Sequence, residues 1–584
     1  MATASLNPHD LVEFGPFQMY GDGRLLHGGR PVALAPKERA VLRVLVDAGG
    51  RVVAKDELLD RAWPDEDVSE SSLTRCMHTL RNQLGNGARG AECIETVYGQ
   101  GYRLTLPVER VASSVRLLLL PFEPDPAAPV EPERCDRIGE EVIEQLTRYQ
   151  GRGLTVIARD TSRRFGQDPR PTEALAREVD AGFVLKGRLA GRGGRLALGV
   201  SLLAAQGGER LLARTFERDE GDLRALPSDI AAAVAGRLPL RVSSARDPRL
   251  VSADHTTPRV YEAYLEARML FRARTPERMR RAAALYEQAI AWDPRFAPAC
   301  VGLADCTSST VFMTTTGRDE GLSKIERLLD EATAIDPATP GLAVLRAATR
   351  SAFHWDFAGA EPLFREALER DVADTAGLNF YARHLHGSGR PERAAEVLRS
   401  LLDLDPLQPF AHAHRGYALF CARQWDEALA EVRRGLELEA SAGPLAYHCV
   451  VAGHLGWREE ALGSARRLLD AAGSVPLFAV TAADALARGG DEASARRVIE
   501  LADSQPGWLA PSFTAVAAEA LGDTNGAVRW LERALAMRCV WLPTVRCDPR
   551  LDGIRGDPRV RAVFEQVRPQ SEPVRPREAV RLRA

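Results

Sequence analysis

Apolar side chains between residues 70 and 84 recur at intervals of three or four positions. This spacing predicts an amphipathic helix whose inward stripe is Leu73, Met77, Leu80 and Leu84. The opposite side presents hydrogen-bond donors and no acidic residue; its members are Ser71, Arg75, His78, Thr79 and Asn82, with Arg81 on the flank. We therefore expect a helix that shows a donor-rich face to solvent.

Two short strands follow this helix, over residues 94–98 and 102–106, and are joined across Gly99-Gln100-Gly101. Upstream, the pattern predicts short strands between residues 11 and 34 and helices over 36–48 and 53–63. A donor-lined helix followed at once by a basic-tipped hairpin suits the major groove of double-stranded DNA. The alternative is that the polar face of the helix is merely solvated.

The segment Leu80-Arg81-Asn82-Gln83-Leu84, with Thr96-Val97, Gly99 and Gly101-Tyr102-Arg103 after it, resembles the winged-helix domain of OmpR/PhoB-type response regulators. The resemblance covers residues 11–107 and is closer to HilA/CadC-like transcription regulators, which lack a receiver domain in front. It implies an α+β winged-helix domain over residues 1–110, with the helix as recognition helix and the hairpin as wing. The DNA-binding residues predicted from this resemblance and from the helix face are Ser71, Ser72, Thr74, Arg75, His78, Thr79, Arg81, Thr96, Tyr98, Tyr102 and Arg103.

Two features favour a different use of this domain. Tyr98 stands where phosphate-responsive members of the family carry an arginine, so the wing tip lacks that charge. Basic residues do not outnumber acidic ones across residues 1–110, and acidic residues 65–67 and 70 lie at the start of the recognition helix. Affinity for non-specific DNA scales with the number of neutralised phosphates and should be weak. The alternative function is an interaction scaffold whose winged helix binds protein.

The whole chain has 584 residues, which is more than one hydrophobic core usually supports, so several domains are expected. Its net charge of -3 excludes a generally polybasic protein. Nine cysteines without paired spacing indicate reduced thiols and no metal site. Residues 1–9 do not resemble a signal peptide, and no apolar run is long enough to span a bilayer. We expect a cytoplasmic protein that is nucleoid-associated when bound to DNA, with no membrane partner.

Residues 114–240 alternate between strand-like and helical patterns, which predicts an α/β module. The order of these elements, with Leu119-Leu120-Pro121-Phe122 and Glu178-Val179-Asp180-Ala181-Gly182, resembles the TolB-N-like module of bacterial regulators. Residues 159–164, after the second strand, are rich in Arg, Asp, Thr and Ser and could form an anion site. A solvated loop is the favoured interpretation. Neither a Walker loop nor Gly-x-Ser-x-Gly occurs, so no enzyme is predicted.

A small-x3-large-x2-small pattern recurs beyond the polar linker at residues 240–258. Its eight occurrences begin at Ala282, Ile325, Ala360, Ala394, Ala428, Ala461, Ala495 and Ala527. Most are about 34 residues apart, which is the period of tetratricopeptide (TPR) repeats. The pattern predicts an all-α superhelix over residues 259–543 with about eight repeats, followed by a C-terminal cap and disordered tail over 544–584.

Stacked TPR repeats form a concave face that usually holds a peptide or partner protein. Transferring the family's binding offsets gives the partner-binding residues Asn379, Arg383, His386, Tyr417, Phe420 and His454. Ordinary packing or solvent contact is the alternative for each of them, and is favoured. The pairs His384/His386 and His412/His414 are not metal sites, because residues two apart on a helix point in different directions.

Together these patterns predict a multidomain protein: a winged helix, then an α/β module, then a TPR superhelix. The predicted function is a bacterial, sequence-specific DNA-binding transcription regulator controlled through its TPR array. Its predicted partners are double-stranded DNA, an unidentified protein or peptide on the array, and RNA polymerase. It needs no cofactor. No receiver domain precedes the winged helix, so control by receiver phosphorylation is not expected.

Overall fold

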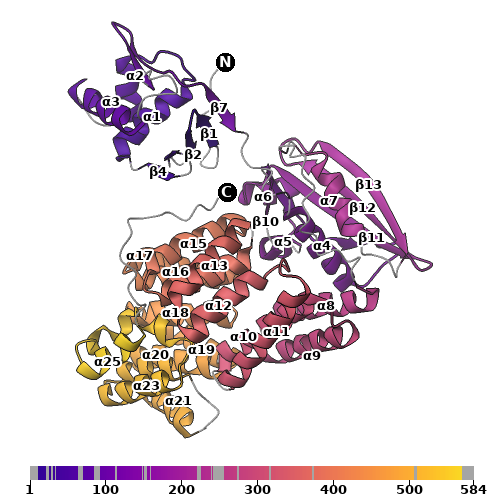
Figure 1. Cartoon of the computed structure of the whole chain (residues 1–584), viewed down its shortest axis with the longest axis vertical. Helices are drawn as coiled ribbons and strands as arrows, with labels where there is room; N and C mark the ends of the chain where they lie inside the picture. Colours follow the sequence, from indigo (N-terminus) through magenta and orange to yellow (C-terminus); the bar gives the residue numbers. More distant parts are fainter. Residues whose placement is uncertain are drawn as a thin grey trace.

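The three predicted units follow one another along the chain in the computed structural model (Figure 1). The structure describes residues 11–20, 25–27, 30–32, 34–63, 70–84, 93–111, 115–147, 149, 154–157, 159–166, 168–219, 225–238, 240, 256–272, 275–314, 317–370, 374–504 and 510–567. A winged helix precedes a mixed sheet with helices, and a long all-helical TPR-like array completes the chain. This order confirms the predicted fold class.

The winged helix places three helices between a five-stranded antiparallel sheet and a two-stranded hairpin. The sheet order is β4-β3-β2-β1-β7, and β5 pairs with β6. The elements are β1 (Leu11–Phe14), β2 (Phe17–Tyr20), β3 (Leu25–His27), β4 (Arg30–Val32), α1 (Pro36–Asp47), α2 (Lys55–Ala62), α3 (Glu70–Leu84), β5 (Ile94–Val97), β6 (Gly101–Leu104) and β7 (Val108–Val111).

Strand β7 extends the winged helix at its C-terminal end. The family resemblance ends at residue 107, but Val108–Val111 pairs antiparallel with β1, with Val111 opposite Leu11. Pairing with the first strand of the domain satisfies backbone groups that a linker would leave to water. The last strand of the winged helix therefore ends at Val111.

The apolar stripe of α3 lies in the core of the winged helix, as its spacing predicts: Leu73, Met77, Leu80 and Leu84 are all buried. The hairpin is fixed to the same core at Gly101. A Cβ there would lie 2.0 Å from the carbonyl oxygen of Val53, and the backbone has φ +143°. Only glycine fits this approach, which lets Val53 and Tyr102 exchange backbone hydrogen bonds of 2.8 and 2.9 Å.

The middle module has a mixed sheet of order β10-β8-β11-β12-β13, with β9 beside β11. Strand β8 pairs in parallel with β10 and β11, whereas β11, β12 and β13 are antiparallel. Its elements are β8 (Val115–Leu119), β9 (Glu123–Pro124), α4 (Pro132–Thr147), β10 (Leu154–Ile157), α5 (Arg159–Phe165), α6 (Thr172–Glu178), β11 (Phe183–Arg192), β12 (Arg195–Ala204), β13 (Arg210–Asp219) and α7 (Leu226–Ala235).

The helices of the array each pack on the next along the chain. Their small and large repeat positions interlock in the core; for example, Ala282, Tyr286 and Ala289 are at most 1% exposed. The helices are α8 (Pro258–Arg272), α9 (Pro276–Trp292), α10 (Ala297–Thr314), α11 (Arg318–Ile335), α12 (Leu342–His354), α13 (Phe357–Arg370), α14 (Thr375–Gly387), α15 (Pro391–Leu404), α16 (Pro409–Cys421), α17 (Trp425–Leu438), α18 (Ala442–His454), α19 (Arg458–Ala472), α20 (Pro476–Gly489), α21 (Glu492–Ser504), α22 (Pro511–Ala520) and α23 (Thr524–Ala536).

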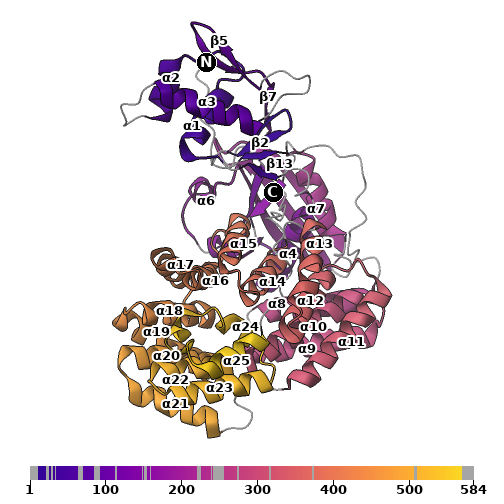
Figure 2. The ribbon, with the colours of Figure 1, turned by 60° about the vertical axis from the view of Figure 1, so that its left-hand side comes forward.

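The chain then turns back into the curve of the array. Helix α24 (Leu542–Val545), the 3₁₀ helix η3 (Pro549–Ile554) and α25 (Pro558–Gln566) follow α23. Figure 2 shows α24 between the early helices α10 and α14 and the late helices α20 and α22. One hydrophobic core contains residues from both ends of the array, including Phe312 and Trp541. The predicted tail, residues 568–584, lies outside the described part of the chain.

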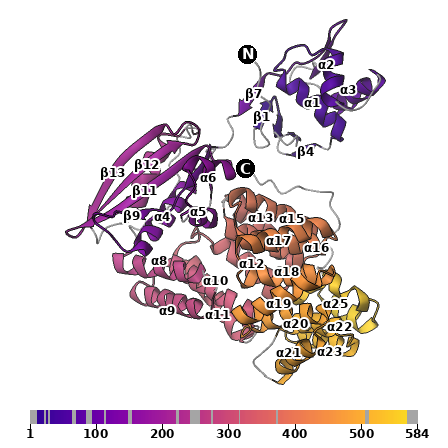
Figure 3. The ribbon, with the colours of Figure 1, turned by 180° about the vertical axis from the view of Figure 1, so that it is seen from behind.

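The middle module is docked against the array, as Figures 1 and 3 both show. Arg268 of α8 donates to Glu144 of α4 at 2.6 Å. At the other end of the module, Thr161 donates from its backbone N–H and its hydroxyl to the Asp405 carboxylate, at 3.1 and 2.6 Å. Leu407 and Leu438 of the array share a buried cluster with apolar residues of the module.

This docking corrects the interpretation of residues 159–164 as a solvated loop. They begin helix α5, where Thr161 is buried against Asp405 of the array and Ser162 is buried within the module, donating its hydroxyl to the Leu119 carbonyl oxygen of β8. The anion beside the start of α5 is a carboxylate of the same chain, Asp405. Burial, together with neighbouring Asp160, raises the pKa of Asp405 to about 7. The polar composition of residues 159–164 is therefore explained by an internal contact.

The described residues contain no helix with the length and hydropathy of a membrane span. Within the same part of the chain, no group of three His, Cys, Asp or Glu residues is arranged to hold a metal ion. All nine cysteines lie in described segments as free thiols.

Candidate nucleic-acid interface and inner face of the array

The outer side of α3 carries the donors that its sequence predicts. Ser71, Thr74, Arg75 and His78 are exposed, whereas Ser72 and Thr79 are half-buried. The Thr79 hydroxyl donates to the Arg75 carbonyl oxygen at 3.2 Å, and Asn82 Nδ2 lies 3.2 Å from His78 Nε2. The side-chain hydroxyls, guanidinium and imidazole on one side of a straight helix make a surface that can contact acceptors on base edges.

Arg81 connects α3 to the wing instead of pointing to solvent. Its Nε donates to the Ile94 carbonyl oxygen at 3.0 Å, and its Nη2 donates to the Thr96 hydroxyl at 2.7 Å. The guanidinium carbon also lies 6.0 Å from the centroid of the Tyr102 ring, and Tyr102 is only 7% exposed. Sequence analysis missed this brace because it joins residues on separate elements. Arg81, Thr96 and Tyr102 are placed to fix the angle between α3 and the wing.

The tip of the wing is a turn at residues 98–100 whose most exposed side chain is aromatic. Tyr98 is 93% exposed, so its ring is free of packing contacts and accessible to a partner. Arg103, on the strand after the turn, pairs with Glu95 at 2.7 Å, and each side chain is 45% exposed. The acidic residues 65–67 and Arg89 lie outside the described residues.

The predicted partner-binding residues of the array lie near one another, and two of them, Arg383 and Tyr417, contact the chain's own C-terminal residues. We call Asn379, Arg383, His386, Tyr417, Phe420 and His454 the inner face, and residues 539–556 the C-terminal segment. Tyr417 donates its hydroxyl to Asp548 at 2.8 Å. The Arg383 guanidinium lies 5.4 Å from the centroid of the Trp541 ring, and Trp541 Nε1 donates to the Phe312 carbonyl oxygen at 2.9 Å.

A buried ion network anchors the C-terminal segment. The Arg550 side chain is fully buried and donates to Asp484 of α20 at 2.7 Å and to Asp548 at 2.6 Å. Burial alone would raise the pKa of Asp548, but the Arg550 guanidinium and the Tyr417 hydroxyl hold it at about 2. Sequence analysis missed this network. Its only local sign is the Asp548-Pro549-Arg550 sequence, and Asp-Pro-Arg occurs at four other places in the chain, including Asp557-Pro558-Arg559.

Neutral histidines line the same region. His386 is 1% exposed, its ring centroid lies 4.9 Å from that of Tyr417, and burial lowers its pKa to about 4. Burial, with the nearby positive charge of Arg383, also lowers the pKa of His414, whose Nδ1 lies 2.9 Å from Asn379 Oδ1. Burial and the Arg488 and Arg550 charges lower the pKa of His454.

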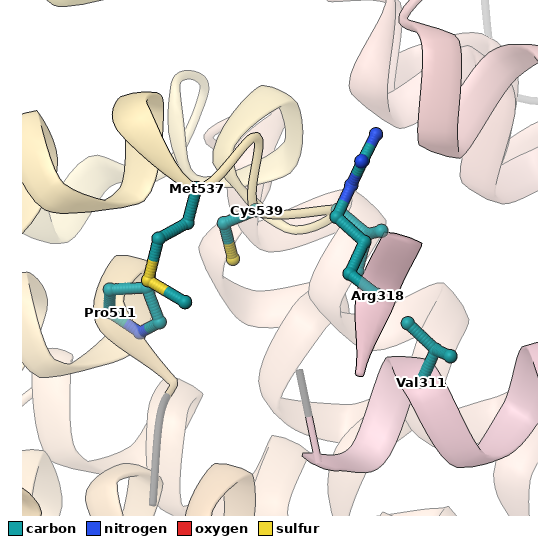
Figure 4. Close-up of a pocket in the computed structure, with 6 residues that line it drawn as sticks. Val311, Arg318, Pro511, Met537 and Cys539 are labelled. Atoms are coloured by element: carbon teal, nitrogen blue, oxygen red, sulfur yellow. The ribbon is translucent and has the colours of Figure 1, made fainter. Parts of the chain in front are cut away.

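A small cavity lies where the C-terminal segment leaves α23. Figure 4 shows Val311, Arg318, Pro511, Met537 and Cys539 around it, from both ends of the array. Its volume of about 10 Å³ is close to the minimum needed for one water molecule. It is too small for an organic ligand.

Residues 29–104 match a family model described as "Transcriptional regulatory protein, C terminal". The chain is 26% identical to the transcriptional regulator HilA of Salmonella typhi over 436 residues, which cover 73% of this chain and 76% of that protein. It is 42% identical to the transcriptional regulatory protein CutR of Streptomyces coelicolor over 77 residues, covering 13% of this chain and 34% of that protein.

Two solved structures are similar to parts of the chain. The DNA-binding domain of E. coli CadC is 26% identical, with a TM-score of 0.17, and the match covers 18% of this chain and all of that one. A thermophilic TPR protein of Thermus thermophilus is 19% identical, with a TM-score of 0.23, and the match covers 39% of this chain and 98% of that one.

The family match and the HilA similarity show that the chain resembles transcriptional regulators, with the match to the family model confined to residues 29–104. The individual contact residues and the role of the array stay predictions.

Proposed function

We propose that the chain regulates transcription by placing α3 in the major groove of specific DNA sites, with the wing beside it. The observation that carries this proposal is the outer side of α3, where exposed donors are held at a fixed angle to the wing by Arg81. Base edges in the major groove offer acceptors to such donors, and a braced wing restricts the helix to one orientation.

Within this proposal, Arg75, His78 and Thr79 read bases, and Ser72 contacts the phosphate backbone. Ser71, Thr74 and Arg103 border the same surface, and Tyr98 contacts the backbone or minor groove from the wing tip. Arg81, Thr96 and Tyr102 were also predicted to contact DNA. Because these three side chains are tied to one another, we assign them to positioning the wing, and any phosphate contact they make is secondary.

A selection from randomised duplexes at low salt tests the proposal with the full chain. We expect one enriched site, and Arg75→Ala should change which bases are enriched. Arg43→Ala is the matched control, because Arg43 lies on α1 and is not among the predicted DNA-contacting residues, so this variant should leave the enriched site unchanged. Absence of any enriched sequence from the wild-type protein would contradict DNA recognition.

A protein-binding winged helix is the second candidate function, and Tyr98 is the observation that favours it. An aromatic ring that is 93% exposed is typical of a protein contact as well as of stacking on DNA. In this case the same selection would enrich nothing, and the chain would act as a TPR scaffold with two protein-binding ends.

We further propose that the array captures a protein or peptide and thereby controls the winged helix. The middle module, which resembles the TolB-N-like module, would transmit the change because it is docked on the array through Asp405 and Arg268. RNA polymerase is the second protein partner expected at a promoter, and the site of action is the nucleoid. A partner alters DNA affinity only if it binds the competent and incompetent arrangements differently. A coupling of about 1–3 kcal/mol suffices for a switch.

A chain that ends at Val111 tests this control. We expect it to choose the same DNA sites as the full chain but to lose the dependence of transcription on growth conditions. If its target genes respond to every condition as they do with the full chain, the array is not the input.

A further inference from the structure

The inner face of the array is occupied by the C-terminal segment of the same chain. Trp541 lies 5.4 Å from Phe312 and 5.7 Å from Phe513, ring centroid to centroid, so it touches both ends of the array. Asp548 accepts from Tyr417, and Arg550 donates to Asp484. The segment therefore presents an aromatic ring, a carboxylate and a guanidinium to the side of the array where TPR proteins hold ligands.

Two histidines of the inner face have buried ring nitrogens without a hydrogen-bond partner in the part of the chain that the structure describes. His386 is 1% exposed, yet neither of its ring nitrogens has a hydrogen-bond partner among the described residues. Nδ1 of His454 is likewise buried and unpartnered within that part of the chain. Buried polar atoms are normally hydrogen-bonded, and each exception needs an explanation. Water or a different ligand would satisfy these nitrogens if the C-terminal segment left.

The packing is also incomplete where the C-terminal segment begins. The cavity of Figure 4 lies between Cys539 and Val540 of the segment and Val311, Arg318 and Pro511 of the array. Protein cores are otherwise close-packed, with few voids that could hold a water molecule. The cavity lies at the start of the segment, and the unpartnered nitrogens lie on α14 and α18, where His386 packs on Tyr417 and His454 on Phe420. Tyr417 in turn donates to Asp548 of the segment.

We propose that the inner face is a binding site for a protein segment, and that residues 539–556 are its internal ligand. This segment leaves by local opening, and a partner segment takes its place. The inference rests on the proposed capture of a partner by the array and names the chemistry of that partner. The incoming segment carries an aromatic residue for the position of Trp541, a carboxylate for Tyr417 and a guanidinium for Asp484.

Displacement is possible because the partner segment replaces the same kinds of contact. A neutral segment without a guanidinium would leave the buried Asp484 with only one of its two arginine partners, Arg488, which is unfavourable. The internal segment competes at a high effective concentration because it is joined to the array. Weakening the internal segment must therefore raise the affinity of the array for a free segment of the same sequence.

Hydrogen–deuterium exchange of the full wild-type chain tests local opening without any partner. Amides of Thr544, Val545 and Asp548 are hydrogen-bonded within the C-terminal segment. If the segment opens locally, these amides exchange at least tenfold faster than the buried amides of α20 and α22 that pack against it. Exchange less than tenfold faster would mean that the segment opens only with the array and would overturn the inference.

A disulfide lock provides the matched test. A Cβ at Gly387 of α14 would lie 3.5 Å from the Pro543 Cβ of α24, within the range of disulfide geometry. The double variant Gly387→Cys/Pro543→Cys, once oxidised, should slow exchange in the C-terminal segment to the rate of α22, and reduction should restore it. The control is Gly387→Ser/Pro543→Ser, which cannot form the bond. Fast exchange that persists in the oxidised variant would contradict the proposal.

A labelled synthetic peptide with the sequence of residues 539–556, with serine for its two cysteines, is the binding probe. Arg550→Ala weakens the internal segment, so the full-length variant should bind this peptide at least tenfold more tightly than wild type does. Arg559→Ala, which removes an exposed arginine outside the segment, should bind like wild type, and the oxidised lock should not bind. Asp548→Asn replaces Arg550→Ala if the latter does not fold.

Equal binding to the Arg550→Ala variant and to the oxidised lock would place the peptide elsewhere and overturn the inference. The outcome is separate from that of the regulatory proposal. If the segment opens and the peptide binds but the Val111 truncation still regulates normally, the proposed control fails and the binding site stands. If the segment never opens but the truncation abolishes regulation, the proposed control stands and the proposed binding site fails.

Discussion

Of the five Asp-Pro-Arg sequences in the chain, the two nearest the C-terminus, at Asp548 and Asp557, form the same turn, and of these two only the first is buried. At Asp548 and at Asp557, the aspartate Oδ1 accepts a hydrogen bond from the backbone N–H of the arginine two residues later, at 2.9 and 2.8 Å. In both copies the guanidinium also pairs with its own aspartate, at 2.6 Å for Arg550 and 2.8 Å for Arg559. Each copy begins a helix, η3 or α25.

The surroundings of the two turns differ. The Arg550 side chain is fully buried and also pairs with Asp484 of α20, whereas the Arg559 side chain is 49% exposed and its further partner is Asn525. An exposed ion pair is screened by water, but a buried charge that loses its partner is very unfavourable. Identical local sequence therefore specifies the turn, while distant residues decide whether the turn holds the array together.

The largest expected effect is the difference in stability between variants that lack the arginine of one copy or of the other. Arg550→Ala leaves Asp548 buried without its guanidinium and leaves Asp484 with Arg488 as its remaining ion-pair partner. The free energy of unfolding of the array should therefore fall by about 3–5 kcal/mol. Urea denaturation followed by circular dichroism measures it. Arg559→Ala should leave the urea midpoint unchanged. Equal midpoints for the two variants would show that burial does not distinguish the turns.

The buried copy should also make stability depend on pH. Its Asp548 accepts from Tyr417, and the ring of His386 packs on Tyr417. Because the folded pKa of His386 is about 4, below its value of 6.5 in the unfolded chain, the unfolded chain binds more protons as pH falls. Stability contributed by neutral His386 is present above pH 6.5 and is lost as pH falls toward 4. The loss between pH 6.5 and 5 should be on the order of 2 kcal/mol.

His386→Phe isolates this effect, since phenylalanine keeps a ring against Tyr417 but cannot take up a proton. The difference in unfolding free energy between wild type and this variant should grow in the variant's favour from pH 7 to pH 5. Asp405 acts in the opposite direction in the whole chain, because its raised pKa adds stability as pH falls below about 7. A pH-independent difference between the two proteins would contradict the assignment to His386.

The contrast between an engaged and an exposed arginine also occurs on α3, with smaller expected effects. Arg75 is exposed, so Arg75→Ala should cost about 1–3 kcal/mol of discrimination at the base it contacts and leave stability unchanged. Arg81 braces the wing, so Arg81→Ala should weaken binding to all duplexes alike. Fluorescence anisotropy with the selected site and single-base variants measures both. A uniform loss for both substitutions would contradict this division.

The smallest effect is expected at Tyr98, which is 93% exposed and buries little surface in the free protein. Tyr98→Arg should leave the urea midpoint unchanged and strengthen binding to any duplex at low salt. It should also add about one to the magnitude of the slope of log affinity against log salt concentration, because it supplies one more phosphate contact. An unchanged salt dependence would mean that the wing tip does not approach DNA.

Periodic patterns predicted the elements that build this molecule. The spacing of Leu73, Met77 and Leu80 predicted α3, and the recurrence of small and large residues predicted the array, because these signals repeat within one element or from one repeat to the next. The exposed donors of α3 could be predicted for the same reason, since the stripe that is buried defines the side that is not.

Contacts between distant segments could not be predicted in this way. From the sequence, Arg81 was predicted to contact DNA phosphates, but in the structure it binds Thr96 of β5. Thr161 was predicted to lie in a polar loop, but it binds Asp405 of the array. The network of Asp484 and Arg550 joins residues 66 positions apart. Such a pairing leaves no periodic pattern in the sequence. The repeats therefore indicated the residues of the inner face, but not the C-terminal segment that lies against them.

The core shared by the two ends of the array has a consequence for its synthesis. Linear repeat proteins contact only neighbouring repeats, so each can fold as it leaves the ribosome. Here Phe312 packs against Trp541, which lies 229 residues later in the chain. The early helices must wait with part of their apolar surface uncovered until the last residues have been translated, at about 5–20 residues per second. During that interval of roughly ten seconds or more, the nascent chain depends on chaperones to avoid aggregation.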